Sequence, residues 1–168
     1  GLDTKEELQK ACEAARKANE LNKYKACKAL LAVLSKKWDI KNEKWDFVIL
    51  QEMSNGPITS KASFLENAEK LCEKIRENGA KPVFYATWAY QRGGKKLETF
   101  GMDYDEMYQK LYEAYHLAAD RNHTLIADVG KKFYELSDKV NLYADDGCHP
   151  NEKGSQIAAE IIAEVLMN

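Results

Sequence analysis

The chain has 168 residues with 45% hydrophobic and 31% charged residues, which is ordinary for one globular domain. Its formal net charge is −2, and Lys and Arg are spread along the chain rather than clustered. This distribution argues against a nucleic-acid partner or an anionic membrane surface, and no apolar run approaches the ~20 residues of a membrane span.

The four cysteines, Cys12, Cys27, Cys72 and Cys148, form no C-x-x-C pair, so a zinc site is not expected. They are interpreted as reduced thiols, although their even number is also compatible with a secreted, disulfide-bridged form. A first residue of Gly instead of Met is typical of a processed or truncated chain. The compartment, cytoplasmic or secreted after signal removal, stays undetermined.

Two amphipathic helices are predicted in the first part of the chain. Residues 3–20 begin with the capping residues Asp3 and Thr4, and residues 23–37 carry a stronger apolar stripe. A nearly continuous apolar run then covers residues 45–50. This run is typical of a strand that is buried on both faces of a parallel sheet.

Strands and helices alternate from this point onward. Strands are predicted at 45–50, 82–88 and 124–129, and helices at 63–78, 104–122, 131–137 and 151–167. Residues 51–60 are expected to be a polar loop and residues 91–101, with three glycines, a long mobile loop. The order predicts one domain with a doubly wound α/β fold, in which 1–44 is a helical N-terminal part and 45–168 the α/β core.

Polar residues follow each predicted strand, at 51–55, 87–92 and 128–130. In a doubly wound sheet the carboxyl ends of the strands form the ligand-binding rim. The loop from Asp146 to His149 precedes the last helix and can reach the same rim. The sequence therefore predicts a site at this edge.

The pair Asp146 and His149 is the most informative feature of this rim. A carboxylate that orients an imidazole, with the imidazole able to move a proton, is two-thirds of a serine-hydrolase triad. The alternative interpretation is a loop held by an Asx-type turn and a helix cap. Cys148 and Ser54 are weaker candidates for a nucleophile, and His116 and His123 are interpreted as structural.

Three segments together resemble the SGNH (GDSL-like) hydrolases, from about Trp45 to the C-terminus. They are Trp-Asp-Phe-Val-Ile-Leu-Gln-Glu-Met-Ser-Asn at 45–55, Pro-Val-Phe-Tyr-Ala-Thr-Trp at 82–88, and Tyr-Ala-Asp-Asp-Gly-Cys-His-Pro at 143–150. The last is the most specific, since Asp-x-x-His followed by Pro, Gly154 and a helix is similar to the family's fifth block.

The resemblance implies a flavodoxin-like three-layer α/β/α fold and the hydrolysis of esters, often acetyl groups on carbohydrate, without a metal or other cofactor. By position, His149 is the general base and Asp146 its orienting carboxylate. Segment 51–55 supplies an oxyanion-hole side chain, for which Gln51, Ser54 and Asn55 are the candidates. Trp88 is a candidate for lining the substrate pocket, together with Thr87 and Tyr90.

The family's first block, a strand ending in Gly-Asp-Ser or Gly-Asn-Ser, has no counterpart in the sequence. None of the serines, which are Ser35, Ser54, Ser60, Ser63, Ser137 and Ser155, follows such a strand. The chain is therefore incomplete, or another chain supplies the strand and serine, or the domain is a non-catalytic binding or interaction domain. Without the first strand, the edge of the strand at 47–50 is expected to be exposed, which favours a homo-oligomer or a complementing chain.

Overall fold

The computed structural model describes residues 26–30 and 44–168, the first of these segments by its backbone alone. A parallel four-stranded sheet forms its centre, with the strands in chain order: β1 (Ala26–Leu30), β2 (Phe47–Gln51), β3 (Lys81–Ala86) and β4 (Leu125–Asp128). The register pairs Ala26 with Phe47, Phe47 with Lys81, and Val83 with Leu125. The carboxyl ends of β2, β3 and β4 therefore point to one end of the molecule.

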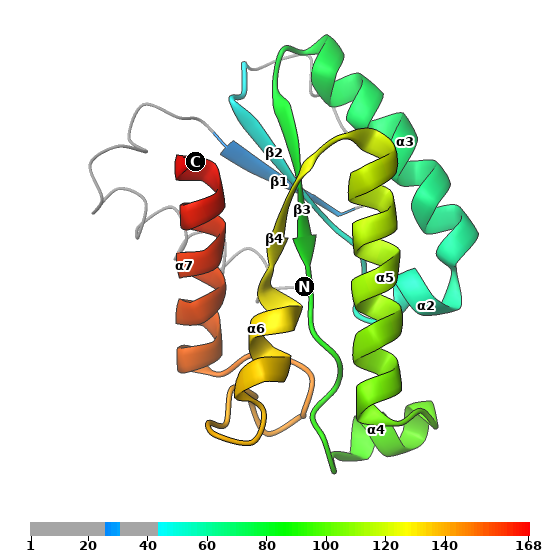
Figure 1. Cartoon of the computed structure of the whole chain (residues 1–168), viewed down its shortest axis with the longest axis vertical. Helices are drawn as coiled ribbons and strands as arrows, with labels where there is room; N and C mark the ends of the chain where they lie inside the picture. Colours follow the sequence, from blue (N-terminus) through cyan, green and yellow to red (C-terminus); the bar gives the residue numbers. More distant parts are fainter. Residues whose placement is uncertain (1–25, 31–43) are drawn as a thin grey trace.

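Helices cover both faces of the sheet. Helices α3 (Lys61–Glu77) and α5 (Tyr104–Asn122) lie on one face, and α6 (Val129–Leu136) and α7 (Glu152–Met167) on the other (Figure 1). Two short helices, α2 (Gly56–Thr59) and α4 (Lys95–Phe100), follow the carboxyl ends of β2 and β3. This arrangement confirms the α/β fold that the alternation of elements predicted and the three layers that the family resemblance implied.

Alternate residues of the strands build two separate hydrophobic cores. Val48 and Leu50 of β2 pack with α3 and α5, whereas Phe47 and Ile49 pack with α6 and α7. Both sets are almost fully buried, as the period-two alternation of a strand covered on both faces requires. The apolar run that predicted this strand therefore serves both cores.

Three expectations for the regular structure are wrong. Residues 26–30, predicted as part of a helix over 23–37, form β1, because pairing with β2 overrides the helix propensity of Ala and Leu. The loop predicted over 91–101 contains α4, which ends at Gly101 in the left-handed conformation (φ 74°). The loop predicted over 51–60 contains α2, which begins with a Pro in its first turn.

The edge of β2, expected to be exposed, is covered by β1 along five residue pairs. The helix expected over 3–20 lies outside the described residues, as does the remainder of the helix expected over 23–37. None of the described helices is long and apolar enough to cross a bilayer.

Gly130, in the first turn of α6, allows this helix to pack closely on the end of β3. A Cβ atom at this position would lie 2.2 Å from the backbone oxygen of Thr87, which cannot move without shifting β3. We expect Gly130→Ala to lower the free energy of unfolding by about 2–3 kcal/mol. Chemical denaturation of the wild type and the variant measures this difference.

Gly101→Ala provides the matched control. A Cβ atom added at Gly101 would meet no other atom within 4 Å. The φ of Gly101 is 74°, so only the backbone conformation opposes the substitution. Its expected cost is about 1 kcal/mol. Equal losses in the two variants would contradict the close approach of Gly130 to Thr87.

Candidate active site

The loop between α6 and α7 is folded back on itself. Tyr143 and Pro150 form an isolated antiparallel bridge, and the Ala144 N–H donates to the His149 carbonyl at 2.8 Å. The Gly147 N–H donates to the Ala144 carbonyl at 3.0 Å. Gly147 has a φ of 66°, which only a glycine adopts at little cost. The tight turn brings Asp146 and His149 together at the tip of the loop.

Asp146 holds His149 through both of its carboxylate oxygens. Oδ1 accepts the backbone N–H groups of Cys148 and His149, each at 2.9 Å. Oδ2 is hydrogen-bonded to Nδ1 of the His149 ring. The two side chains are 40% and 46% exposed, so the pair is open to a substrate.

The same contacts lower the pKa of the Asp146 carboxyl group. Partial burial works to raise the pKa of Asp146, but the hydrogen bonds from the Cys148 N–H, the His149 ring and the His149 N–H outweigh it. The pKa of Asp146 falls from its ordinary value of 3.8 to about 2. Asp146 is therefore ionised near neutral pH, as an orienting carboxylate must be.

The loop is tied to the segment after β3 by three hydrogen bonds. The Trp88 indole N–H donates to the Cys148 carbonyl at 2.8 Å, and the Gln91 N–H donates to the Gly147 carbonyl at 2.8 Å. The Tyr143 hydroxyl donates to the Ala89 carbonyl at 2.7 Å. These contacts join residues that are more than 50 positions apart in the sequence. They hold the pair Asp146 and His149, called the dyad below, beside the end of β3 on the rim of the sheet.

The start of α7 fixes the other side of the loop. The Asn151 side chain accepts the Gly154 N–H at 2.9 Å, which caps the helix. A Cβ at Gly154 would lie 2.4 Å from the Leu142 carbonyl oxygen, so a glycine is needed for this approach. The Asx-type turn and the helix cap of the alternative interpretation are thus both present, together with the Asp146–His149 pair.

The segment after β2 is supported by a buried polar network. The Glu52 N–H donates to the Tyr115 hydroxyl at 3.2 Å, and the Met53 N–H donates to the Glu52 carboxylate at 2.7 Å. Burial raises the pKa of Glu52, against the opposing effect of the Met53 N–H. It also raises the pKa of Tyr115 to about 12. This network holds the backbone from which Ser54 and Asn55 project.

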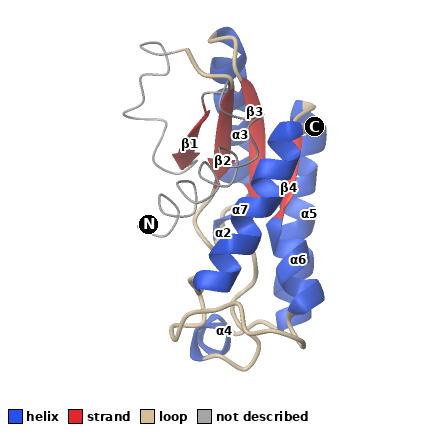
Figure 2. Cartoon of the chain, turned by 90° about the vertical axis from the view of Figure 1, so that its left-hand side faces the viewer, coloured by secondary structure: helices blue, strands red, loops and turns tan. Residues whose placement is uncertain are grey.

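A pocket of about 670 Å³ lies between these segments. Asn55 lines it together with Asp146 and Gly147, and the remaining lining residues are Tyr90, Gln91, Gly94, Lys95, Lys96, Thr99, Phe100 and Asp145. Figure 2 shows α4 and the loops gathered at this end of the molecule, below the sheet. The volume falls within the range of small-molecule sites.

The three candidates for the oxyanion-hole side chain have different surroundings in the structure. Asn55 lines the pocket, and its amide makes no hydrogen bond to the described residues. The Ser54 hydroxyl is 3.0 Å from the Tyr90 hydroxyl, within hydrogen-bond distance. The side-chain oxygen of Gln51 is buried without a partner in the described part of the chain.

Trp88 has a different place from the one predicted for a substrate-binding residue. It is 8% exposed, it stacks on Phe133 at 4.3 Å between ring centroids, and its indole N–H is taken by Cys148. Trp88 therefore supports the loop from behind. It is not among the residues that line the pocket.

The pocket residues Lys95 and Lys96 of α4 were not predicted, because residues 91–101 were expected to form a mobile loop. The apolar spacing of Leu97 and Phe100 was the available signal for a helix there. His116, interpreted as structural, pairs with Asp128 at 2.7 Å and stacks on Tyr112. His123 ends α5 in the left-handed conformation.

Comparison with known proteins identifies the family of the chain. No protein-family model and no curated protein matches the chain. Among solved structures, a candidate SGNH hydrolase from Slackia heliotrinireducens is 39% identical with a TM-score of 0.75, over 82% of this chain and 79% of that one. At this identity and coverage, the chain belongs to the SGNH hydrolase family.

More distant structures share the fold. A catalytic mutant of an acetylxylan esterase from Geobacillus stearothermophilus is 16% identical with a TM-score of 0.63, over 82% of this chain and 68% of that one. A DUF4886 family protein from Bacteroides uniformis is 22% identical with a TM-score of 0.62, over 76% of this chain and 52% of that one.

The pKa of Asp146 makes a prediction about stability. Because the folded-state pKa lies below the ordinary value of 3.8, the ionised carboxylate stabilises the fold above about pH 4. This contribution is lost as the pH falls toward 2. We expect the free energy of unfolding of Asp146→Asn to fall less than that of the wild type between pH 4 and pH 2, measured by denaturant titration.

His149→Ala separates the contributions to this pKa. The variant loses the ring contact but keeps both backbone N–H donors, so we expect the pKa of Asp146, measured by NMR, to rise and yet stay below 3.8. A wild-type carboxyl that titrates near 3.8 would rule out the described geometry.

Proposed function

We propose that the protein is an esterase that transfers an acyl group to water by a Ser–His–Asp mechanism, with His149 as general base and Asp146 as its orienting carboxylate. The observation that carries this proposal is the bond between Asp146 and Nδ1 of His149, at the edge of a pocket on the rim of the sheet. Membership of the SGNH hydrolase family supports the reaction class.

The orientation of His149 determines how protons move. With Nδ1–H donating to the ionised Asp146, the lone pair of the ring lies on Nε2. Nε2 accepts the serine proton as the serine oxygen attacks the ester carbonyl, and then returns that proton to the leaving alcohol. A water molecule repeats the sequence on the acyl-enzyme and releases the acid.

The nucleophilic serine lies outside the described residues in this proposal. Of the described serines, Ser54 contacts Tyr90, the Ser137 hydroxyl donates to the Tyr134 carbonyl, and Ser155 is buried in α7. Ser60 and Ser63 lie at the start of α3 and do not line the pocket. A serine from elsewhere in the protein, or from a complementing chain, completes the triad.

Asn55 is the proposed oxyanion donor. Its amide has no hydrogen-bond partner among the described residues and lines the same pocket as Asp146. Ser54 contacts Tyr90, and the indole of Trp88 is already bonded. A free, positioned amide is the group that stabilises a developing oxyanion.

The proposed substrate is an acylated carbohydrate or another small ester. The pocket has aromatic walls from Tyr90 and Phe100 and polar groups from Asn55, Gln91 and Thr99. Such a mixture suits a sugar ring, which has both apolar faces and hydroxyl groups. The acetylxylan esterase with the same fold supports this choice of substrate class.

Labelling with a fluorophosphonate probe tests the mechanism. We expect one adduct on a serine outside residues 26–30 and 44–168 of the natural, full-length protein, located by peptide mass spectrometry. In His149→Ala the labelling rate should fall by a factor of about 10²–10⁴, because the serine loses its general base.

His116→Ala is the matched control, because His116 is also paired with an aspartate, Asp128, but neither of these two residues lines the pocket. Its labelling rate should equal that of the wild type. No adduct on any serine, in protein that is folded by circular dichroism, would favour a non-catalytic SGNH-like binding domain instead.

A second substitution tests the oxyanion donor. Asn55→Ala should lower kcat for an acetyl ester by a factor of about 10²–10³ with little change in KM, because the amide acts mainly in the transition state. Ser54→Ala should change kcat only a few-fold. The reverse order of the two effects would transfer the role to Ser54.

A further inference from the structure

The pocket has a cationic wall that the proposed chemistry does not use. Lys95 and Lys96 of α4 both line it, whereas Asp145 and Asp146 line it from the loop before α7. Figure 1 shows α4 and that loop as separate segments at the same end of the molecule. The two charge types therefore enter one pocket from different elements.

Neither lysine is neutralised within the described structure. The described ion pairs of lysine involve Lys70, Lys110 and Lys132, and none of these lines the pocket. The Lys96 ammonium lies 5.8 Å from the centroid of the Tyr90 ring, itself a pocket wall. This contact directs one of the two charges along the wall of the pocket.

The opposite wall does not supply a partner for the lysines. The Asp146 carboxylate is engaged by the Cys148 N–H, the His149 N–H and the His149 ring. Asp145 is exposed, and no ion pair is described for it. Both lysines are exposed, and two unpaired ammonium groups on one wall of a pocket attract an anion more strongly than a single group does.

We propose that Lys95 and Lys96 bind an anionic group of the substrate, a carboxylate or a phosphate, so that the preferred ester is an acylated sugar acid or sugar phosphate. That the substrate is an ester rests on the proposed function, whereas the anionic group is inferred from the pocket alone. Repulsion from Asp145 and Asp146 keeps the anionic group at α4, which leaves the ester end beside His149.

Binding of unreactive sugars tests the anion site without any catalysis. Methyl glucuronide, methyl glucoside and a hexose phosphate would be titrated by calorimetry into the natural, full-length protein at low salt. We expect at least one anionic sugar to bind about fivefold or more tightly than the neutral glucoside. Raising the salt to about 1 M should abolish the preference, because the charges are near the surface.

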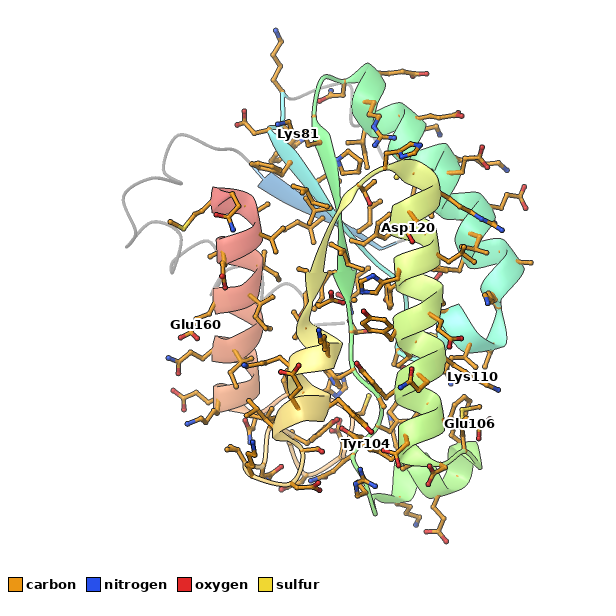
Figure 3. All side chains as sticks on the ribbon, viewed as in Figure 1. Lys81, Tyr104, Glu106, Lys110, Asp120 and Glu160 are labelled. Atoms are coloured by element: carbon orange, nitrogen blue, oxygen red, sulfur yellow. The ribbon has the colours of Figure 1, made fainter. Side chains whose placement is uncertain are left out.

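Lys95→Met and Lys96→Met keep a long, unbranched side chain and remove the charge. Each should reduce the preference for the anion several-fold, and the double variant should abolish it. Lys81→Met is the matched control, because Lys81 is exposed at the opposite end of the molecule from Tyr104 (Figure 3) and does not line the pocket. The preference should be unchanged in this variant.

Every outcome bears on one of the two proposals separately. A preference for glucuronide indicates sugar acids and a preference for the phosphate indicates sugar phosphates, and both support the anion site. Equal binding of neutral and anionic sugars, no binding of any sugar, or an equal loss in Lys81→Met, overturns it. A serine adduct with no anion preference leaves the esterase intact, and an anion preference with no adduct leaves the anion site intact.

Discussion

The hydrogen bond from the Trp88 indole to the Cys148 carbonyl is the contact on which the site depends. Trp88 follows β3, and Cys148 lies between Asp146 and His149, so this bond connects the sheet to the dyad. The stack of Trp88 on Phe133 of α6 adds about 0.5–1.5 kcal/mol beyond burial and holds the indole in orientation. Together with the bonds from the Gln91 N–H to the Gly147 carbonyl and from the Tyr143 hydroxyl to the Ala89 carbonyl, the Trp88 bond holds the loop on the rim.

The sequence predicted the α/β core because the physical signals were local and strong. The apolar run at 47–50 predicted a strand that is buried on both faces, and the long amphipathic stretches predicted α3, α5 and α7. The Asp146–His149 pair was equally accessible, since both residues lie in one turn with Gly147. Their contact requires no knowledge of distant parts of the chain.

The remaining features depend on tertiary contacts that a local pattern does not contain. Residues 26–30 have the composition of a helix and form β1 because β2 offers an edge. Trp88 was predicted at the pocket because it follows a strand, but its indole turns toward Cys148. Lys95 and Lys96 were expected to lie in the mobile loop over 91–101, although Leu97 and Phe100 anchor a short helix there.

The two kinds of contact in the site differ greatly in sequence separation. Asp146 and His149 are three residues apart, whereas Trp88 and Cys148 are 60 apart. Closing the short loop costs little chain entropy, but the long-range tether can form only after β3 and α6 have met. The contact between Asp146 and His149 can therefore form as soon as its turn forms, whereas its position on the rim depends on the assembly of the sheet with α6.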